Sequence, residues 1–302
     1  SRRARIAAAA AALDYHPNPA ARRLAARRSL IVATLLPTIE SDIFARGTAA
    51  IAATLEQAGY TLFIGATGYD QEREFHLARR FLARGADGLI FMGASHLPAL
   101  YELLERRRVP FVNQGVFAPE GPYPSVGFDN ARAAGLAVGH LLALGHRRIG
   151  MIAGVSAGND RAAGRIAGLR ARLAEAGLVP TGVVERLYTL AGGADGLNAL
   201  WDGPARPTAI VCGNDVLALG ALFAAARRGI AVPHAVSLIG FDDLAVAEAV
   251  PPGLSSIAIP TEDMGRRAAE YLLARLAGED PPAHQEIPVT LRPRGSTAPP
   301  GR

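Results

Sequence analysis

The chain has 302 residues, of which 50% are hydrophobic and 20% are charged, and its net charge is +5. This composition excludes an intrinsically disordered protein, and the length suffices for two lobes of ordinary size. No apolar run approaches the roughly 20 residues of a membrane-spanning helix. The single cysteine, Cys212, excludes an internal disulfide and is typical of a reducing compartment. We therefore expect a cytoplasmic globular protein without a membrane partner.

The positive charge is concentrated at the beginning of the chain. Residues 1–28 contain seven arginines and one acid, a net charge of +6, whereas the other 25 basic and 26 acidic residues nearly cancel. A positive segment on a near-neutral body is typical of an arm that contacts DNA phosphates. A solvated helical tail in an arginine-rich protein would look similar, since the chain contains no lysine. Charge alone leaves both interpretations open.

Within this segment, the sequence predicts one helix, a stop at YHP (15–17) and a short second helix that Asn18 caps. Ala21, Arg22 and Leu24 follow on the second helix. A small residue permits close approach to a groove, an arginine meets phosphates and a leucine can insert between base steps. Packing of Leu24 on the body of the protein is the structural alternative.

Short apolar runs then alternate with amphipathic segments of helix length. The first set consists of strands at 30–37, 61–66, 88–93 and 109–114, separated by helices at 44–58, 71–83 and 97–107. A second set begins with a helix at 131–144. It continues with strands at 147–154, 183–188, 208–214 and 236–242. Three helices separate these strands: one at 161–176, one that ends at residue 200 and one that ends at residue 228. This alternation predicts crossover connections and parallel sheets.

The tail adds a strand at 255–260, a helix at 261–276 and the run 285–293, which we expect to return to the first lobe; 296–302 predicts a frayed end. The predicted fold class is therefore α/β with two lobes, each a parallel sheet flanked by helices. The N-terminal lobe comprises 30–130 plus 260–292, and the C-terminal lobe comprises 131–259. Ligands bind at the carboxyl ends of parallel strands, so we expect a cleft between the lobes.

Catalytic motifs are scarce. No G-x-G-x-x-G follows the first strand, no Walker-type phosphate loop occurs, and we expect no G-x-S-x-G nucleophile elbow. The seven histidines are scattered, and His140 with His146 lacks carboxylates at a zinc-ligand spacing. The strand-end pair Asp242–Asp243 suits catalysis or a metal, but it has no companion nucleophile, and acids at strand ends commonly bind ligand hydroxyls. The sequence thus disfavours an enzyme and predicts neither a metal nor a cofactor.

The segment from Arg5 resembles the last headpiece helix and the hinge helix of LacI/GalR transcriptional repressors, whose pattern is R-I-x-x-A-x-x-x-L-x-Y-x-P-N-x-x-A-R-x-L. Further blocks at the family's spacing are VGFDN (126–130), LGHRRIGMIAG (144–154), GRIAGLRARLAEAGL (164–178), RPTAIVCGNDVLALGALFAAARRGIAVPHAVSLIGFDD (206–243) and LSSIAIP (254–260). The resemblance covers almost the whole chain. It implies a periplasmic-binding-protein-like core, a homodimer and operator DNA as partner, with expression of a catabolic operon controlled by a small effector.

The resemblance implies that residues 1–29 are the remnant of a DNA-binding headpiece and hinge helix. The family's helix-turn-helix would precede Ser1, so we expect an N-terminally truncated chain. Operator contacts are assigned by resemblance to the hinge residues Asn18, Ala21, Arg22 and Leu24.

The resemblance also implies an effector site between the lobes. It assigns effector contacts to Ile43, Phe44, Arg165, Tyr188, Asn214 and Asp242. Asn113 is a further candidate because it directly follows the strand-like run VPFV, where many family members carry an acid a little later. Arg161, one helical turn before Arg165, adds a second positive charge on the same face. Two arginines favour an anionic effector, and LPTIESDIF and GYDQERE resemble the gluconate-repressor branch, so we expect a sugar or sugar acid. Structural roles are the alternative for each residue, with the aromatic rings in the core and Asp242 capping a loop.

Three other functions remain open at this point. A solute-binding protein of a sugar transporter has the same two-lobed fold, but it gives no reason for the arginine-rich segment. An α/β enzyme would need a catalytic group that the motifs do not supply. A regulator of the same family could instead respond to a nucleobase.

Overall fold

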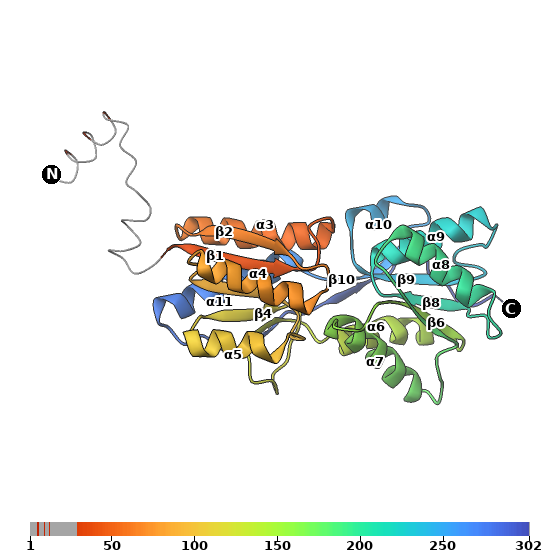
Figure 1. The fold of residues 1–302 in the computed structure, drawn as a ribbon. Helices are drawn as coiled ribbons and strands as arrows, with labels where there is room; N and C mark the ends of the chain where they lie inside the picture. Colours follow the sequence, from red (N-terminus) through yellow and green to blue (C-terminus); the bar gives the residue numbers. More distant parts are fainter. Residues whose placement is uncertain (1–4, 6–8, 10–11, 13–28, 302) are drawn as a thin grey trace.

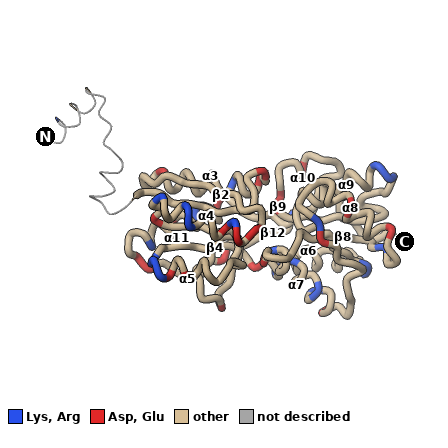
Figure 2. Tube along the Cα trace, viewed as in Figure 1, with Lys and Arg blue, Asp and Glu red and all other residues tan. Residues whose placement is uncertain are grey.

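The computed structural model describes residues 5, 9, 12 and 29–301, and they form two α/β lobes arranged end to end (Figure 1). Arginines and acids are interspersed over both lobes (Figure 2). The predicted operator contacts Asn18, Ala21, Arg22 and Leu24 lie outside the described residues. Within the described part, no helix has the length and hydropathy needed to cross a membrane. The predicted fold class is confirmed.

The N-terminal lobe contains a parallel sheet of six strands in the order β11-β5-β4-β3-β1-β2. Its strands are β1 (Ile31–Leu36), β2 (Thr61–Ala66), β3 (Gly88–Met92), β4 (Phe111–Gln114), β5 (Ser125–Gly127) and β11 (His284–Glu286). Helices α3 (Asp42–Gln57) and α11 (Thr261–Ala277) pack against each other on the sheet. The sheet is also flanked by α4 (Gln71–Ala83) and α5 (Pro98–Arg107).

The C-terminal lobe repeats this arrangement with the order β12-β10-β9-β8-β6-β7, in which only β12 runs antiparallel. Its strands are β6 (Ile149–Gly154), β7 (Val183–Arg186), β8 (Ala209–Cys212), β9 (Ser237–Asp242), β10 (Ser255–Ala258) and β12 (Thr290–Arg292). Its helices are α6 (Asn130–Ala143), α7 (Asp160–Ala174), α8 (Leu190–Trp201), α9 (Asp215–Arg227) and the short α10 (Ala245–Ala249).

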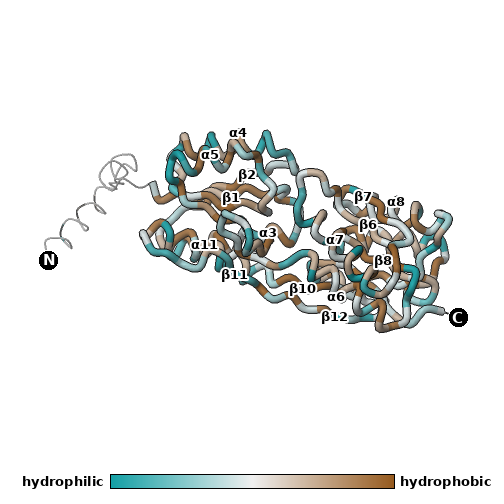
Figure 3. Tube along the Cα trace, turned by 90° about the horizontal axis from the view of Figure 1, so that it is seen from below, coloured by the Kyte–Doolittle hydropathy of each residue, from teal (hydrophilic) through white to brown (hydrophobic). Residues whose placement is uncertain are grey.

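Both faces of each sheet are covered, which explains the continuous apolar runs in the sequence. In β1, Ile31, Ala33 and Leu35 pack with α4 and α5, while Val32 packs with α3 and α11. Figure 3 shows the same pattern along the molecule, with hydrophobic strands and more hydrophilic outer helices. The hydrophobic effect therefore orders each lobe as a three-layer sandwich.

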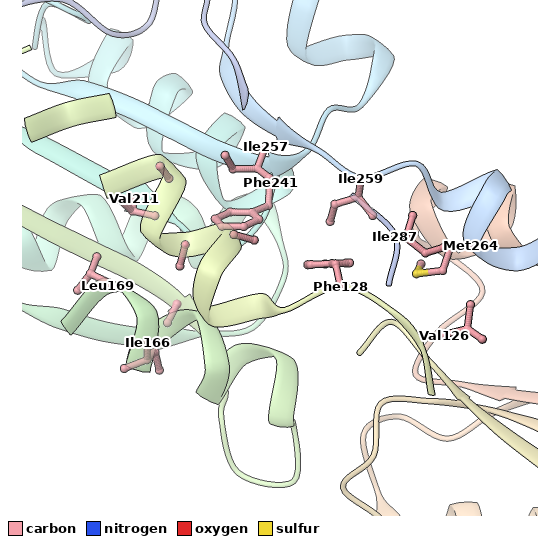
Figure 4. Packing of buried hydrophobic residues seen from close by; sticks show 14 of the residues in the cluster. Val126, Phe128, Ile166, Leu169, Val211, Phe241, Ile257, Ile259, Met264 and Ile287 are labelled. Atoms are coloured by element: carbon pink, nitrogen blue, oxygen red, sulfur yellow. The ribbon is translucent and has the colours of Figure 1, made fainter. Parts of the chain in front are cut away.

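Three chain segments cross between the lobes, at 127–130, 258–261 and 286–290. Each segment contributes one buried apolar side chain, and Phe128, Ile259 and Ile287 are 3%, 4% and 1% exposed. Figure 4 shows Phe128 and Ile259 between the buried residues of the two lobes. These three side chains, which we call the hinge cluster, belong to a single buried apolar cluster that extends into both lobes.

The C-terminal residues differ from the prediction in two ways. Only β11 of the run 285–293 joins the first sheet, whereas β12 pairs with β10 in the second. The predicted frayed end is wrong, because Ser296 is fully buried and its main chain bonds to Leu238 and Gly253. Its hydroxyl donates to the Leu238 carbonyl over 2.6 Å. Small hydroxyl side chains let this segment fit against the amino ends of β9 and β10.

Candidate ligand-binding cleft

A cavity of about 410 Å³ lies between the lobes, at the carboxyl ends of their strands. Seven of the eight predicted site residues line it, namely Ile43, Phe44, Arg161, Arg165, Tyr188, Asn214 and Asp242. The wall also includes Thr38, Tyr69, Asn159, Leu187 and Thr189. The lining mixes aromatic, apolar and polar side chains, as in sites for small organic ligands.

The N-terminal lobe supplies the wall from the ends of β1, β2 and β3. Ile43 and Phe44 lie in the first turn of α3, which follows β1 after a short loop. Tyr69 follows β2 with a φ of 64°, an uncommon conformation for a residue with a Cβ atom. Its position after a predicted strand was a usable signal, although the sequence did not single it out.

Arg165 lies on α7 and is buried within the C-terminal lobe. Its Nε donates to Asn130 Oδ1 over 3.1 Å, and its Nη1 donates to the Gly213 carbonyl. The guanidinium carbon lies 4.5 Å from the centroid of the Phe241 ring. Both hydrogen bonds end on neutral oxygens and the third contact is an aromatic face, so these partners fix the arginine without cancelling its charge.

Arg161 has different partners, although it lies one turn earlier on α7. Its Nη1 donates to the Met92 carbonyl of the other lobe over 2.9 Å and lies 3.0 Å from Asp160 Oδ1. The other oxygen of Asp160 accepts from the Ala94 N–H over 2.6 Å. The first turn of α7 thus bonds to the main chain at the end of β3 and just after it. We call these contacts of Asp160 and Arg161 the rim contact. Asp160 balances the charge of Arg161.

Asp242 ends β9 and its carboxyl faces the cavity. Burial raises its pKa to about 7, with the nearby Arg165 acting in the opposite direction. Asp215 lies behind it and is fully buried, and burial together with the charge of Asp242 raises its pKa to about 8. At neutral pH this pair therefore holds protons that ordinary carboxyls have lost, and Asp242 can donate as well as accept hydrogen bonds.

Asn214 and Tyr188 combine structural and lining roles. The Asn214 side-chain oxygen caps α9 by accepting from the Leu217 N–H over 2.9 Å, which leaves its amide nitrogen for a ligand. Tyr188 lies beyond the end of β7, shorter than predicted, and its ring centroid is 6.2 Å from that of Tyr69 across the cleft. Burial raises the pKa of the Tyr188 hydroxyl, so it is neutral.

Asn113 does not line the cavity. It is buried at β4, where its side-chain amide donates to the Tyr101 hydroxyl over 3.2 Å. That hydroxyl in turn donates to the Ala94 carbonyl over 3.0 Å, so Asn113 supports the segment that makes the rim contact. Its strand-end position suggested a site residue, but the alternation of side chains along β4 directs it away from the cleft.

The end of β6 and the loop after it contain a pattern that is typical of serine hydrolases. Residues 154–158, GVSAG, match the G-x-S-x-G pattern of serine hydrolases. The Ser156 hydroxyl donates to Glu185 Oε2 over 2.9 Å, and a loop separates β6 from α7 in place of a sharp turn. The pattern therefore lacks the context of a nucleophile elbow. Among the described residues, no three potential metal ligands gather.

Two facing α/β lobes with an aromatic and polar cleft at their strand ends define the class of two-lobed ligand-binding proteins. A family model described as "Periplasmic binding protein-like domain" matches residues 138–297. The chain is 33% identical over 283 residues to the HTH-type transcriptional repressor CytR of Escherichia coli K12, covering 92% of this chain and 82% of CytR. It is 35% identical over 275 residues to the HTH-type transcriptional regulator GntR of Pseudomonas aeruginosa, covering 90% of this chain and 80% of GntR.

The fold is also similar to the lac repressor dimer solved with operator and the anti-inducer ONPF. The TM-score is 0.87 at 26% sequence identity, covering 98% of this chain and 90% of that one. The chain belongs to the LacI family of transcriptional regulators. The resemblance inferred from the sequence blocks is confirmed, and the relatives give no support to a transporter protein.

Proposed function

We propose that this chain is the effector-binding part of a cytoplasmic repressor that controls a catabolic operon as a homodimer. Residues 1–29 connect it to operator DNA, with Asn18, Ala21, Arg22 and Leu24 as the contacts. The names of the relatives support the repressor, and the lac repressor structure, titled as a dimer bound to operator, supports the assembly. An enzymatic activity is not part of the proposal.

The observation that carries the proposal is the cavity between the lobes. Side chains from both lobes line it, including Phe44 from one and Arg165 and Asp242 from the other. A ligand that contacts both lobes stabilises one arrangement of them. By linkage, a change in lobe arrangement that alters operator affinity must also alter effector affinity by the same factor.

The charges in the cleft support a sugar acid as effector. Asp160 balances Arg161, whereas Arg165 bonds to neutral oxygens and its charge is available to a carboxylate. Asp242, with a pKa of about 7, can hydrogen bond to hydroxyl groups in either protonation state. A nucleobase is the second candidate, because Phe44, Tyr69 and Tyr188 offer aromatic faces from both lobes.

Calorimetry with D-gluconate, D-glucose and adenine tests the site and the ligand class together. We expect D-gluconate to bind and Arg165→Ala to abolish the binding while the dimer persists in size-exclusion chromatography. Arg170→Ala, on the exposed side of the same helix, is the control and should bind as the wild type does. Unchanged affinity of Arg165→Ala would remove this residue from the site, and binding of adenine alone would replace the sugar acid with a nucleobase.

The DNA-contacting role of residues 1–29 needs a separate test. In the protein joined to a family helix-turn-helix, we expect Leu24→Ala to weaken operator binding in a gel-shift titration. Equal operator affinity for the two proteins would contradict the proposed role of Leu24.

A further inference from the structure

The turn after β9 contains two consecutive residues in an unusual conformation. Asp242 has a φ of 103° and Asp243 a φ of 54°, and neither is glycine. Residues with a Cβ atom seldom adopt such angles, although aspartate does so more readily than most, and these cases concentrate at functional sites. Here the first of the two residues faces the ligand cavity. The contacts that enforce this turn therefore decide where the Asp242 carboxyl lies.

Two of these contacts come from the buried Asp215 and from β10. The Leu244 N–H donates to Asp215 Oδ2 over 2.8 Å. The Asp243 N–H donates to Ser256 Oγ over 3.1 Å, and this hydroxyl donates to Asp215 Oδ1 over 2.7 Å. These hydrogen bonds fix the N–H groups of Asp243 and Leu244, which belong to the main chain of the turn.

The third contact comes from the C-terminal segment that follows β12. Arg294 Nη2 lies 2.7 Å from Asp243 Oδ1, and the two side chains are only 17% and 21% exposed. Arg294 is itself held at both ends, since its Nη1 donates to the Leu254 carbonyl and its main-chain N–H donates to Ser255 Oγ, each over 2.8 Å. The buried Ser296 then fastens the segment to β9. The guanidinium therefore has a fixed place from which to hold Asp243.

We propose that Arg294 is a positioning residue for the ligand cleft, because its ion pair with Asp243 holds the turn that directs Asp242 into the cavity. The inference rests on the proposed function for the meaning of that cavity, and it goes beyond it by making the C-terminal segment part of the site. Without the ion pair, Asp243 can relax toward an ordinary φ. The adjoining peptide then rotates, and the Asp242 carboxyl moves out of its buried place.

A ligand-free measurement separates positioning from simple electrostatics. The charged groups near Asp242 are Arg165, Asp42, Arg46 and Asp215. Its pKa is raised chiefly by burial, so a turn that relaxes toward water lowers this pKa toward the ordinary value of about 3.9. Loss of a nearby positive charge without movement has the opposite sign and raises the pKa further. The direction of the shift thus distinguishes the two explanations.

The experiment is a carbon-13 NMR titration of aspartate carboxyls in the whole chain, with the Asp242 signal assigned by its loss in Asp242→Asn. We expect the pKa of Asp242 to fall in Arg294→Gln and to stay near the wild-type value in Arg294→Lys, which keeps the ion pair. An unchanged or raised pKa in Arg294→Gln overturns the proposal. If Arg294→Gln does not fold, Arg294→Met, which also removes the guanidinium and leaves every carboxylate in place, replaces it, and the same fall is expected.

Calorimetry with D-gluconate then measures the consequence for binding. We expect Arg294→Gln to bind about tenfold more weakly, and Arg294→Lys to recover most of the affinity. The control is Arg292→Gln, which removes an equal charge from an exposed side chain 4.0 Å from Asp243 and should bind as the wild type does. Equal weakening in both variants overturns positioning by Arg294. If the wild type does not bind D-gluconate, the proposed effector class fails, while the titration still decides the role of Arg294.

Discussion

Two of the places where the lobes meet differ in kind, namely the hinge cluster and the rim contact. The hinge cluster consists of Phe128, Ile259 and Ile287, which are buried and make the apolar core continuous between the lobes (Figure 4). The rim contact consists of hydrogen bonds from the first turn of α7 to the main chain of the other lobe. One contact is apolar and without direction, and the other is polar and directional.

The apolar contact joins the lobes, whereas the polar contact depends on their relative orientation. Apolar packing tolerates small rotations, since its free energy depends on buried area more than on angle. The hydrogen bonds of Asp160 and Arg161 form in only one arrangement of the lobes, and water can replace them when the cleft opens. The hinge cluster therefore keeps the two lobes together, and the rim contact favours the closed cleft. Substitutions at the two places should have different consequences.

Phe128→Ala should give the largest effect. It removes a buried ring from the hinge cluster, and such substitutions cost about 3–5 kcal/mol of the free energy of unfolding. Urea denaturation measures the loss. Val179→Ala, at a side chain that is 79% exposed, is the control and should change stability by less than about 0.5 kcal/mol. A loss below about 1 kcal/mol for Phe128→Ala would mean that the hinge is not packed as described.

Gly93→Ala should break the rim contact with a smaller effect on stability. Gly93 has a φ of 91°, and a Cβ atom there would lie 1.9 Å from Arg161 Nη1 and 2.5 Å from Asp160 Oδ1. The side chains must move away, and the lobes should separate on this side. We expect a loss of about 1–2 kcal/mol, from the strained backbone together with the broken contacts.

Energy transfer between dyes on cysteines introduced at Glu72 and Asp195, which are exposed on opposite lobes, measures the separation. Gly59→Ala is the matched control, because Gly59 has a φ of 77° but a Cβ atom there meets nothing within 4 Å. It should carry the strain without changing the transfer efficiency. If Gly93→Ala left the efficiency at the wild-type value, the rim contact would not control closure.

The parts of the molecule that the sequence predicts are those that depend on local patterns. The alternation of strands and helices predicts both lobes, and strand ends such as Asp242 and Asn214 predict the cleft, because parallel strands bring their carboxyl ends to one edge. The rim contact joins Ala94 to Asp160, 66 positions apart and in different lobes. Its existence depends on how the lobes are oriented, which no local pattern encodes.

The partners of Arg161 and the order of the C-terminal segment are two further features that local sequence patterns do not predict. By position on the helix, Arg161 resembles Arg165, yet one guanidinium bonds across the cleft and the other stays within its lobe. The composition of residues 296–302 predicts a frayed end, but the small side chain of Ser296 fits a gap beside β9. Composition indicates how a segment of this kind behaves on average, whereas the hydrogen bonds of Ser296 decide that this segment is ordered.

Asp160→Ala should have the smallest effect on stability and a local effect on dynamics. The variant removes contacts at the partly buried rim and leaves the apolar core intact, so we expect the free energy of unfolding to change by less than about 1 kcal/mol. The Ala94 amide loses a carboxylate acceptor and should exchange with deuterium about tenfold faster. Asp195→Ala, on an exposed face of α8, is the control. An unchanged Ala94 amide would contradict the rim contact. The same variant also leaves Arg161 without its paired carboxylate, so the Arg161 charge becomes available to D-gluconate. Gly93→Ala breaks the rim contact but keeps Asp160, so Asp160→Ala should bind D-gluconate more tightly than Gly93→Ala does.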